Sequence, residues 1–161
     1  MKKIELRRKI NASISECFDL SRSIDLHITS MNDSNEKAVG GKISGLINLG
    51  EHVTWEAKHF GVNLKLTSRI TEMENPHQFT DEMINGPFKY MKHQHIFREV
   101  DDHTEMTDIF ELEAPFIFIG LMVEKLILKA YLTNLLAKRN LAIKKAAEQK
   151  SPELIQDFQF I

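Results

Sequence analysis

Apolar and charged residues alternate along residues 3–10, so one side of an extended chain there is apolar. A period of two is typical of a half-buried β-strand, and the segment predicts a first strand. Glu16 follows Ser13 at the i+3 position, which is the spacing of a capping box at the start of a helix. Further apolar positions across residues 13–31 predict one or two short helices after the first strand.

Five later segments have the length and composition of strands. They are residues 51–60, 62–73, 77–84, 88–100 and 104–113. The breaks between them are short and contain turn residues, as in Asn85-Gly86-Pro87 and Asp101-Asp102. Strands joined by tight turns pair with their neighbours in sequence. The pattern therefore predicts an antiparallel meander.

A long helix is predicted over residues 116–148, where no proline occurs and apolar residues recur at helical spacing. Its predicted apolar stripe comprises positions 119, 123, 126, 127, 130, 135, 136 and 141. At 1.5 Å per residue such a helix spans about 50 Å, enough to cover the apolar face of a sheet. The basic residues of its second half, Arg139 among them, are interpreted as a solvated face.

The order of elements predicts an α+β fold. A curved antiparallel sheet of about seven strands wraps around one long C-terminal helix, with two short helices after the first strand. We expect residues 1–150 to form a single domain and residues 151–161 to form a C-terminal tail.

Composition narrows the classes of function. The chain has 161 residues, of which 42% are hydrophobic and 27% charged, as expected of one globular domain. The 21 Lys and Arg residues against 23 Asp and Glu residues give a net charge of −2, which disfavours nucleic-acid binding. The single cysteine, Cys17, has no partner for an internal disulfide and is interpreted as a core residue.

No segment predicts export or membrane insertion. The longest apolar run, residues 115–123, is far shorter than the about 20 residues of a transmembrane helix. The N-terminal residues lack the apolar stretch of a signal peptide. We therefore expect a cytoplasmic protein without stable membrane insertion.

Alternation along the strands assigns a set of side chains to the face that the long helix covers. A curved sheet around one helix leaves space between them, so the architecture predicts a cavity. The predicted lining residues are Trp55, His59, Leu66, Phe79, Asp81, Met91, His93, His95, Phe97, Met106, Asp108 and Phe110, together with Phe118 and Met122 at the start of the helix.

Five polar residues fall on this otherwise apolar face: His59, Asp81, His93, His95 and Asp108. An unpaired buried polar group costs about 1–3 kcal/mol, so these side chains are expected to pair with one another, with water or with a ligand. If the Asp101-Asp102 turn closes a short hairpin, three pairs face each other. They are Phe97 with Met106, His95 with Asp108 and His93 with Phe110.

Four interpretations of the polar group stay open: a hydrogen-bond network, an anchor for a ligand head group, a metal site, or acid–base catalysis. The candidate acid–base pairs are His95 with Asp108 and His93 with Asp81. No H-x-x-x-H spacing supports a metal site, so we predict neither a metal nor a cofactor. The sequence also shows no nucleophile or oxyanion hole to complete a catalytic set.

Five motifs carry a resemblance to a known superfamily. They are W-E-A-K-H-F-G (55–61), D-E-M-I-N-G-P-F (81–88), M-K-H-Q-H-I-F (91–97), T-E-M-T-D (104–108) and A-P-F (114–116). With the order of elements over residues 4–145, the chain resembles START-like (SRPBCC, helix-grip, polyketide cyclase/dehydrase-like) proteins. The subgroup is that of small bacterial proteins of undefined role, some labelled cell-division inhibitors. Family members commonly have an aromatic residue where Met91 stands here, which alters the shape of the pocket.

The resemblance implies a hydrophobic cavity and does not imply a catalytic set. The expected function is binding, and through it transport or sensing, of a small hydrophobic ligand such as a lipid, polyketide or isoprenoid-like metabolite. Two alternatives stay open: a cyclase or dehydratase that uses an inner-face His/Asp pair, and a protein-interaction module linked to cell division. The sequence leaves the identity of the ligand and the oligomeric state open.

Overall fold

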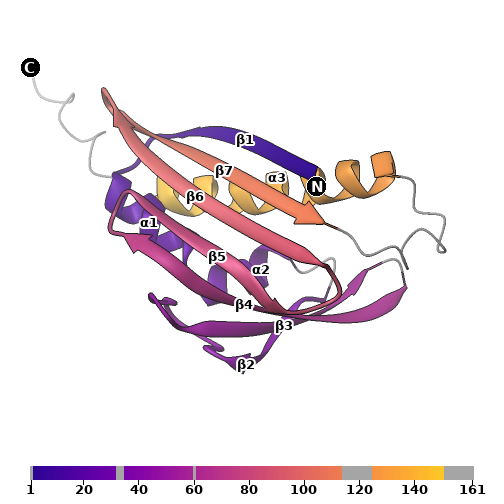
Figure 1. Cartoon of the computed structure of the whole chain (residues 1–161). Coiled ribbons are helices and arrows are strands. Elements are labelled where there is room, and N and C mark those ends of the chain that lie inside the picture. The colour runs from indigo at the N-terminus through magenta and orange to yellow at the C-terminus, as the bar shows by residue number, and fades with distance from the viewer. Residues whose placement is uncertain (1, 32–34, 60, 114–124, 151–161) are drawn as a thin grey trace, which may run out of the picture.

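The computed structural model describes residues 2–31, 35–59, 61–113 and 125–150 (Figure 1). Its strands are β1 (Lys2–Ile10), β2 (Lys37–Gly41), β3 (His52–His59), β4 (Val62–Glu74), β5 (Gln78–Asn85), β6 (Tyr90–Val100) and β7 (His103–Glu113). Its helices are α1 (Ile14–Ser21), α2 (Ile24–Ser30) and α3 (Lys125–Lys150). The predicted tail, residues 151–161, lies outside the described residues.

The seven described strands form one antiparallel sheet in the order β1-β7-β6-β5-β4-β3-β2. The first strand therefore pairs with the last, and the strands from β2 to β7 follow one another as a meander. The three helices lie on the same face of the curved sheet, and α3 runs across it (Figure 1). This arrangement confirms the predicted α+β, helix-grip fold.

The β6–β7 hairpin has the predicted register. Val100 pairs with His103, and Asp101 in the turn between them has a φ of 54°. Aspartate adopts this left-handed conformation more readily than most residues because its short polar side chain bonds to the local backbone. The pairs that follow are Phe97 with Met106, His95 with Asp108 and His93 with Phe110.

Two short helices follow β1, as the capping pattern predicts. Ser13 is the N-cap of α1, and its hydroxyl oxygen accepts a hydrogen bond from the N–H of Glu16. Ser23 caps α2 in the same way and accepts from the N–H of Leu26. Both serines satisfy amide groups that have no partner within the first helical turn.

The alternation pattern did not predict β2. This strand has only five residues, K-A-V-G-G, and glycine has a low preference for strands. It lies at the edge of the sheet and pairs with β3 through an irregular register. Tertiary pairing, and not local preference, makes this segment extended.

The buried face of α3 differs from the predicted stripe. Leu136, Ile143 and Ala147 are buried, whereas Ile127 is 50% exposed and Leu141 is 41% exposed. The helix covers the sheet as expected, but it is rotated so that part of the predicted stripe faces solvent.

Two polar side chains explain this rotation. Arg139 and Asn140 are buried on the inner face of α3, so apolar residues alone do not define that face. Leu135, a member of the predicted stripe, is half-buried. Val123, another member, lies outside the described residues.

Candidate functional site

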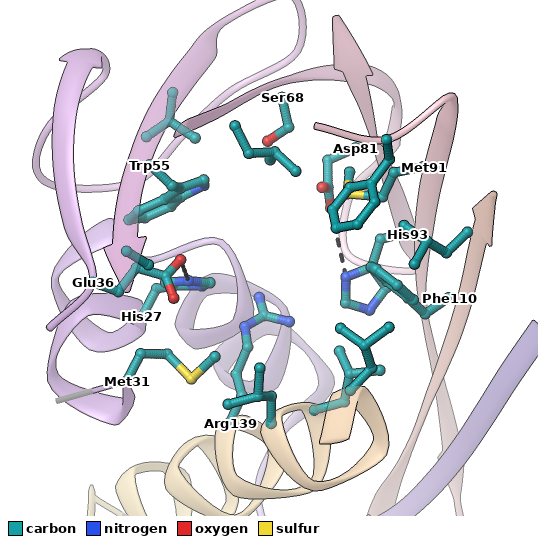
Figure 2. A pocket seen from close by; sticks show the side chains of 18 of the residues that line it. His27, Met31, Glu36, Trp55, Ser68, Asp81, Met91, His93, Phe110 and Arg139 are labelled. Carbon is teal, nitrogen blue, oxygen red and sulfur yellow. Dashed lines mark hydrogen bonds and ion pairs between the residues drawn. The ribbon is translucent and has the colours of Figure 1, made fainter. Parts of the chain in front are cut away.

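A cavity of about 530 Å³ lies between the sheet and the helices (Figure 2). Its wall is mostly apolar and comes largely from the inner faces of β3 and β4 and from α3. Its apolar residues include Val53, Leu64, Leu66, Ile70, Leu132 and Leu136. The volume falls within the range of about 300–1,000 Å³ that small-molecule pockets occupy.

Most of the predicted lining residues contribute to this wall. They are Trp55, His59, Leu66, Phe79, Asp81, Met91, His93 and Phe110. Alternation along each strand places them there, since successive side chains point to opposite faces. Their contact with a ligand stays a prediction.

The other predicted residues are placed differently. His95, Phe97, Met106 and Asp108 are buried in the core and are not part of the cavity wall. Helix α1 packs over Phe97 and Met106 at one end of the inner face. Its Phe18 ring lies 5.7 Å from that of Phe97, and its Ser21 Oγ lies 3.6 Å from Met106 Sδ. Phe118 and Met122 lie outside the described residues.

Asp81, His93, His95 and Asp108 form one buried polar group on β5, β6 and β7, which we call the strand cluster. His95 Nε2 is hydrogen bonded to Asp81 Oδ2 at 3.2 Å, and His95 Nδ1 lies 2.6 Å from Asp108 Oδ1. His93 Nε2 lies 3.2 Å from the same Asp108 oxygen, and His93 Nδ1 lies 3.9 Å from Asp81 Oδ2. Each carboxylate thus faces both imidazoles.

The contacts of Asp108 are short but poorly directed. This residue is 1% exposed, and neither carboxylate oxygen has an aligned hydrogen-bond donor among the described residues. The facing nitrogens, His93 Nε2 and His95 Nδ1, also lack an aligned partner there. The hydrogen-bonding capacity of the strand cluster is therefore incompletely satisfied, which is unusual for buried polar groups.

His95 was predicted to line the cavity but does not present a nitrogen to it. Its two ring nitrogens face Asp81 on one side and Asp108 on the other, and Phe79 stacks on its ring with centroids 4.2 Å apart. The cluster histidine that lines the cavity is His93, which lies beside Asp81 on the wall (Figure 2). Of the two predicted acid–base pairs, the pair of His93 with Asp81 is the one that reaches the cavity.

Burial opposes ionisation in the strand cluster, and the neighbouring groups decide the outcome. Burial alone raises the pKa of Asp81, but the hydrogen bond with His95 and the charge of His93 hold that pKa below its ordinary value. Burial is likewise outweighed at Asp108, where the charge of His95 and contacts with both histidines hold the pKa well below its ordinary value. Burial and the neighbouring His95 lower the pKa of His93 to about 4. At neutral pH, both carboxylates are ionised and His93 is neutral.

Arg139 of α3 reaches into the cavity across from Asp81 (Figure 2). Arg139 is 8% exposed, and its Nη2 donates a hydrogen bond to the backbone carbonyl oxygen of Ser21 at 2.6 Å. Nη1 is buried and has no hydrogen-bond partner among the described residues. Because an unpaired buried donor costs about 1–3 kcal/mol, an acceptor on a bound molecule gains most at this nitrogen.

A second, partly buried pair, His27 with Glu36, lines the cavity beside α2, and we call it the helix-side pair. His27 Nε2 lies 3.0 Å from Glu36 Oε1, and the indole of Trp55 stacks on the imidazole with centroids 4.1 Å apart. Burial raises the pKa of Glu36, but the hydrogen bond with His27 and the charge of His27 hold it below its ordinary value. One donor meets one acceptor in this pair.

His59 was predicted to join the polar group of the inner face, but it lies apart from the strand cluster. Its Nδ1 forms a hydrogen bond with the hydroxyl of Tyr131 on α3 at 2.7 Å. Burial lowers the pKa of His59. This side chain therefore links β3 to α3 on the cavity wall.

The sequence-based prediction missed Arg139, His27 and Glu36. For Arg139 a signal existed, because it follows Leu132 and Leu136 at positions i+7 and i+3 and so shares their face of the helix. No local signal marked Glu36, which meets His27 only through the packing of α2 against the sheet.

The chain is similar to one protein family and to several solved structures. The model of a family described as "Polyketide cyclase / dehydrase and lipid transport" matches residues 25–138. A protein from Thermus thermophilus has a similar structure, with a TM-score of 0.70 and 14% identity, over 91% of this chain and 99% of that chain. A START superfamily protein from Mycobacterium smegmatis gives a TM-score of 0.69 and 11% identity, over 92% of this chain and 99% of that chain.

A plant protein shares the same architecture. The major latex-like protein 151 of Panax ginseng gives a TM-score of 0.64 and 14% identity, over 91% of this chain and 97% of that chain. Identities this low establish the fold alone. Comparison with curated proteins gives no match.

Among the described helices, none combines the length and the apolar character that a membrane crossing requires. The family match extends over β2 to β7 and into α3, which is more than half of the chain. It agrees with the START-like resemblance carried by the motifs and with the fold of the solved structures. The chain therefore belongs to the polyketide cyclase/dehydrase and lipid transport family.

Proposed function

We propose that the protein binds a small hydrophobic molecule that carries a hydrogen-bond acceptor, such as a carbonyl or hydroxyl oxygen. One observation supports this most directly: the guanidinium of Arg139 reaches into an apolar cavity of about 530 Å³ with its buried Nη1 unpaired. Apolar burial provides the affinity, about 25 cal/mol per Å², and Arg139 orients the molecule. Lipids, polyketides and isoprenoid-like metabolites have this chemistry.

The charges around the cavity favour a neutral acceptor over an anion. The charge of Arg139 helps to lower the pKa values of Glu36 and Asp81, so two ionised carboxylates lie within its electrostatic reach. An anionic head group beside Arg139 would also meet the repulsion of both carboxylates, which is strong where water is excluded. A ketone, ester or alcohol avoids this repulsion.

Binding of the neutral dye Nile red tests the cavity. We expect micromolar affinity, about 8 kcal/mol, and a change in the fluorescence of Trp55, the one tryptophan, which lines the wall. Ala57→Phe fills the cavity from β3 and should abolish binding. Ala130→Phe, on the exposed face of α3, is the matched control and should bind normally. Unchanged dye binding by the Ala57→Phe variant would exclude this cavity as the site.

A pair of ligands tests the role of Arg139. Arg139→Met removes the donor but keeps an extended side chain, and it should weaken binding of a long-chain methyl ketone by about 1–3 kcal/mol. The hydrocarbon of the same length should lose little. Lys138→Met, at the exposed neighbouring position, is the control. Equal losses for ketone and hydrocarbon would contradict an orienting role for Arg139.

Solvent extraction of the purified protein, followed by mass spectrometry, tests the class of the natural ligand. A neutral apolar molecule with at least one carbonyl or hydroxyl oxygen is the expected result. Recovery of no small molecule, together with no dye binding, would favour the alternative of a protein-interaction module.

A further inference from the structure

Three side chains of the strand cluster place metal-donor atoms around one point. His93 and His95 are separated by one residue on β6 and so lie on the same face of the sheet. Asp81 on β5 is the strand partner of His93. Asp81 Oδ2 lies 3.2 Å from His95 Nε2 and 3.9 Å from His93 Nδ1, and the donor atoms of the three residues lie within 4.8 Å of one another. Donors around a tetrahedral zinc ion are about 3.3 Å apart, so small side-chain movements bring these atoms to coordinating distance.

Aromatic packing holds both imidazoles in place. Phe79 stacks on His95 with centroids 4.2 Å apart, and the Phe110 ring meets His93 edge to face at 5.2 Å. Histidines fixed by their surroundings lose little freedom when they coordinate an ion, which is the arrangement that metal sites require.

Asp108 lies behind the two imidazoles, where a carboxylate orients metal-ligating histidines in known metal sites. Its Oδ1 lies 2.6 Å from His95 Nδ1 and 3.2 Å from His93 Nε2. These nitrogens and both Asp108 oxygens are buried without aligned partners among the described residues. If the two nitrogens carry the ring protons, a small rotation gives Asp108 two donors.

That protonation pattern leaves the opposite nitrogens bare, because a neutral imidazole has one N–H. In this tautomer the hydrogen bond between His95 Nε2 and Asp81 Oδ2 is absent. His93 Nδ1, His95 Nε2 and Asp81 Oδ2 are then three acceptors facing one another, which is unfavourable unless a cation lies between them. Asp108 is buried and Asp81 is partly buried, and one divalent cation cancels the two negative charges that they carry.

We propose that Asp81, His93 and His95 bind a divalent transition-metal ion, with Asp108 as a positioning residue. Two histidines and one carboxylate are a donor set that suits zinc or ferrous iron. Because Asp81 and His93 line the cavity, the remaining coordination positions face it and are open to an oxygen atom of a bound molecule. Metal binding itself requires no organic ligand, so this proposal and the proposed function succeed or fail separately.

The first test is titration of the full chain, free of any histidine tag and treated with a chelator, with Zn²⁺ in a calorimeter. We expect one ion per chain with micromolar or tighter affinity. Co²⁺ in place of Zn²⁺ should give visible absorption bands that report nitrogen and oxygen coordination. Absence of saturable binding of either ion would overturn the proposal.

Substitutions locate the ion. Asp81→Asn and His93→Asn each remove a ligand and should weaken Zn²⁺ binding by about 100-fold or more, with loss of the Co²⁺ bands. Asp108→Asn should weaken binding by about 10- to 100-fold but keep the Co²⁺ bands, since the ligands remain. His103→Asn is the matched control, because His103 with Asp102 forms a His–Asp contact on the same hairpin outside the cavity. Unchanged affinity in Asp81→Asn would overturn the proposal.

A measurement on the unsubstituted chain keeps the test decisive if a variant does not fold. In nitrogen-15 NMR spectra of the histidine rings, Zn²⁺ should shift His93 Nδ1 and His95 Nε2 and leave the His103 resonances unchanged. Shifts at other histidines, with none at His93 and His95, would place the ion elsewhere and overturn the proposal.

Discussion

Two groups of histidine and carboxylate line or adjoin the described part of the cavity, the helix-side pair and the strand cluster, and they differ in how well their polar atoms are matched. In the helix-side pair, one imidazole nitrogen lies 3.0 Å from one carboxylate oxygen, and an aromatic ring covers the imidazole. In the strand cluster, two imidazoles and two carboxylates lie together, and four of their buried atoms have no aligned partner among the described residues.

The difference separates a structural pair from a candidate site. The helix-side pair has one direct hydrogen bond and no fully buried polar atom without a partner among the described residues, so the packing of α2 beside β2 and Trp55 accounts for it. An unmatched buried group is unfavourable by itself and persists only if something else satisfies it or if function requires it. A metal ion or a ligand bound at the strand cluster therefore has the larger effect on the free energy of unfolding.

The largest expected effect is that of Asp108→Ala, which breaks the strand cluster. Without Asp108 the imidazole nitrogens that face it lose their nearest acceptor, so we expect a loss of about 1–3 kcal/mol in the free energy of unfolding, measured by urea denaturation. Asp102→Ala, at an exposed position of the neighbouring turn, should leave that free energy unchanged. A loss no larger than that of the control would show that the strand cluster contributes nothing to stability.

The second expected effect concerns Glu36→Gln, which removes the charge of the helix-side pair but keeps a hydrogen-bonding group. We expect a loss of about 1–2 kcal/mol in the free energy of unfolding at pH 7. The pKa of Glu36 lies below its ordinary value in the folded chain, so its stabilising contribution is fully present above the unfolded pKa and is lost as pH falls through the folded pKa.

The free energy of unfolding, measured at a series of pH values, shows whether the contribution of Glu36 is lost as the pH falls. The difference between the unsubstituted chain and Glu36→Gln should shrink as the pH falls below the ordinary pKa of glutamate, about 4.3. A difference that stays constant over that range would mean that Glu36 titrates alike in the folded and unfolded chain, contrary to the structure.

Strand periodicity was enough to find the residues of the strand cluster. Alternation along β5, β6 and β7 placed Asp81, His93, His95 and Asp108 on one face, and the turn at Asp101 set the register between them. The sequence did not reveal that α1 packs against β6 and β7 on that face. Packing between segments far apart in the chain has no periodic signal, so Phe97 and Met106 were expected in the cavity wall but lie beneath α1. His95 and Asp108 were also expected in the wall but are buried, with Phe79 stacked on the His95 ring.

Helix periodicity was less reliable, since the inner face of α3 contains Arg139 and Asn140. Arg139 shares the helix face of Leu132 and Leu136, but an arginine on an amphipathic helix is normally solvated, so the prediction placed it in solvent. The burial of Arg139 depends on partners that other elements supply, such as the carbonyl oxygen of Ser21. Such partners become visible only in the folded chain.

A smaller effect concerns the aromatic ring stacked on the imidazole, a feature that the helix-side pair shares with His95 of the strand cluster. Trp55 and His27 are stacked with an interplanar angle of 24°. A double-mutant cycle with Trp55→Leu and His27→Leu should give a coupling energy of about 0.5–1.5 kcal/mol in the free energy of unfolding. The same cycle with Trp55→Leu and His103→Leu is the control, since His103 begins β7 and does not line the cavity. Additive effects of Trp55→Leu and His27→Leu would mean that the stacking contributes no stability.

The smallest expected effect is at Ile127. It tests the rotation of α3 that brings Arg139 between the helix-side pair and the strand cluster. Ile127 was predicted on the inner stripe, but it is 50% exposed, so Ile127→Gln should change the free energy of unfolding by less than about 0.5 kcal/mol. Leu136→Gln places an amide at a buried position of the cavity wall and should be clearly more destabilising, by about 2 kcal/mol or more. Thermal and urea denaturation of the two variants measure the contrast. If Ile127→Gln were as damaging as Leu136→Gln, α3 would present its other face to the sheet, and Arg139 would no longer reach the cavity.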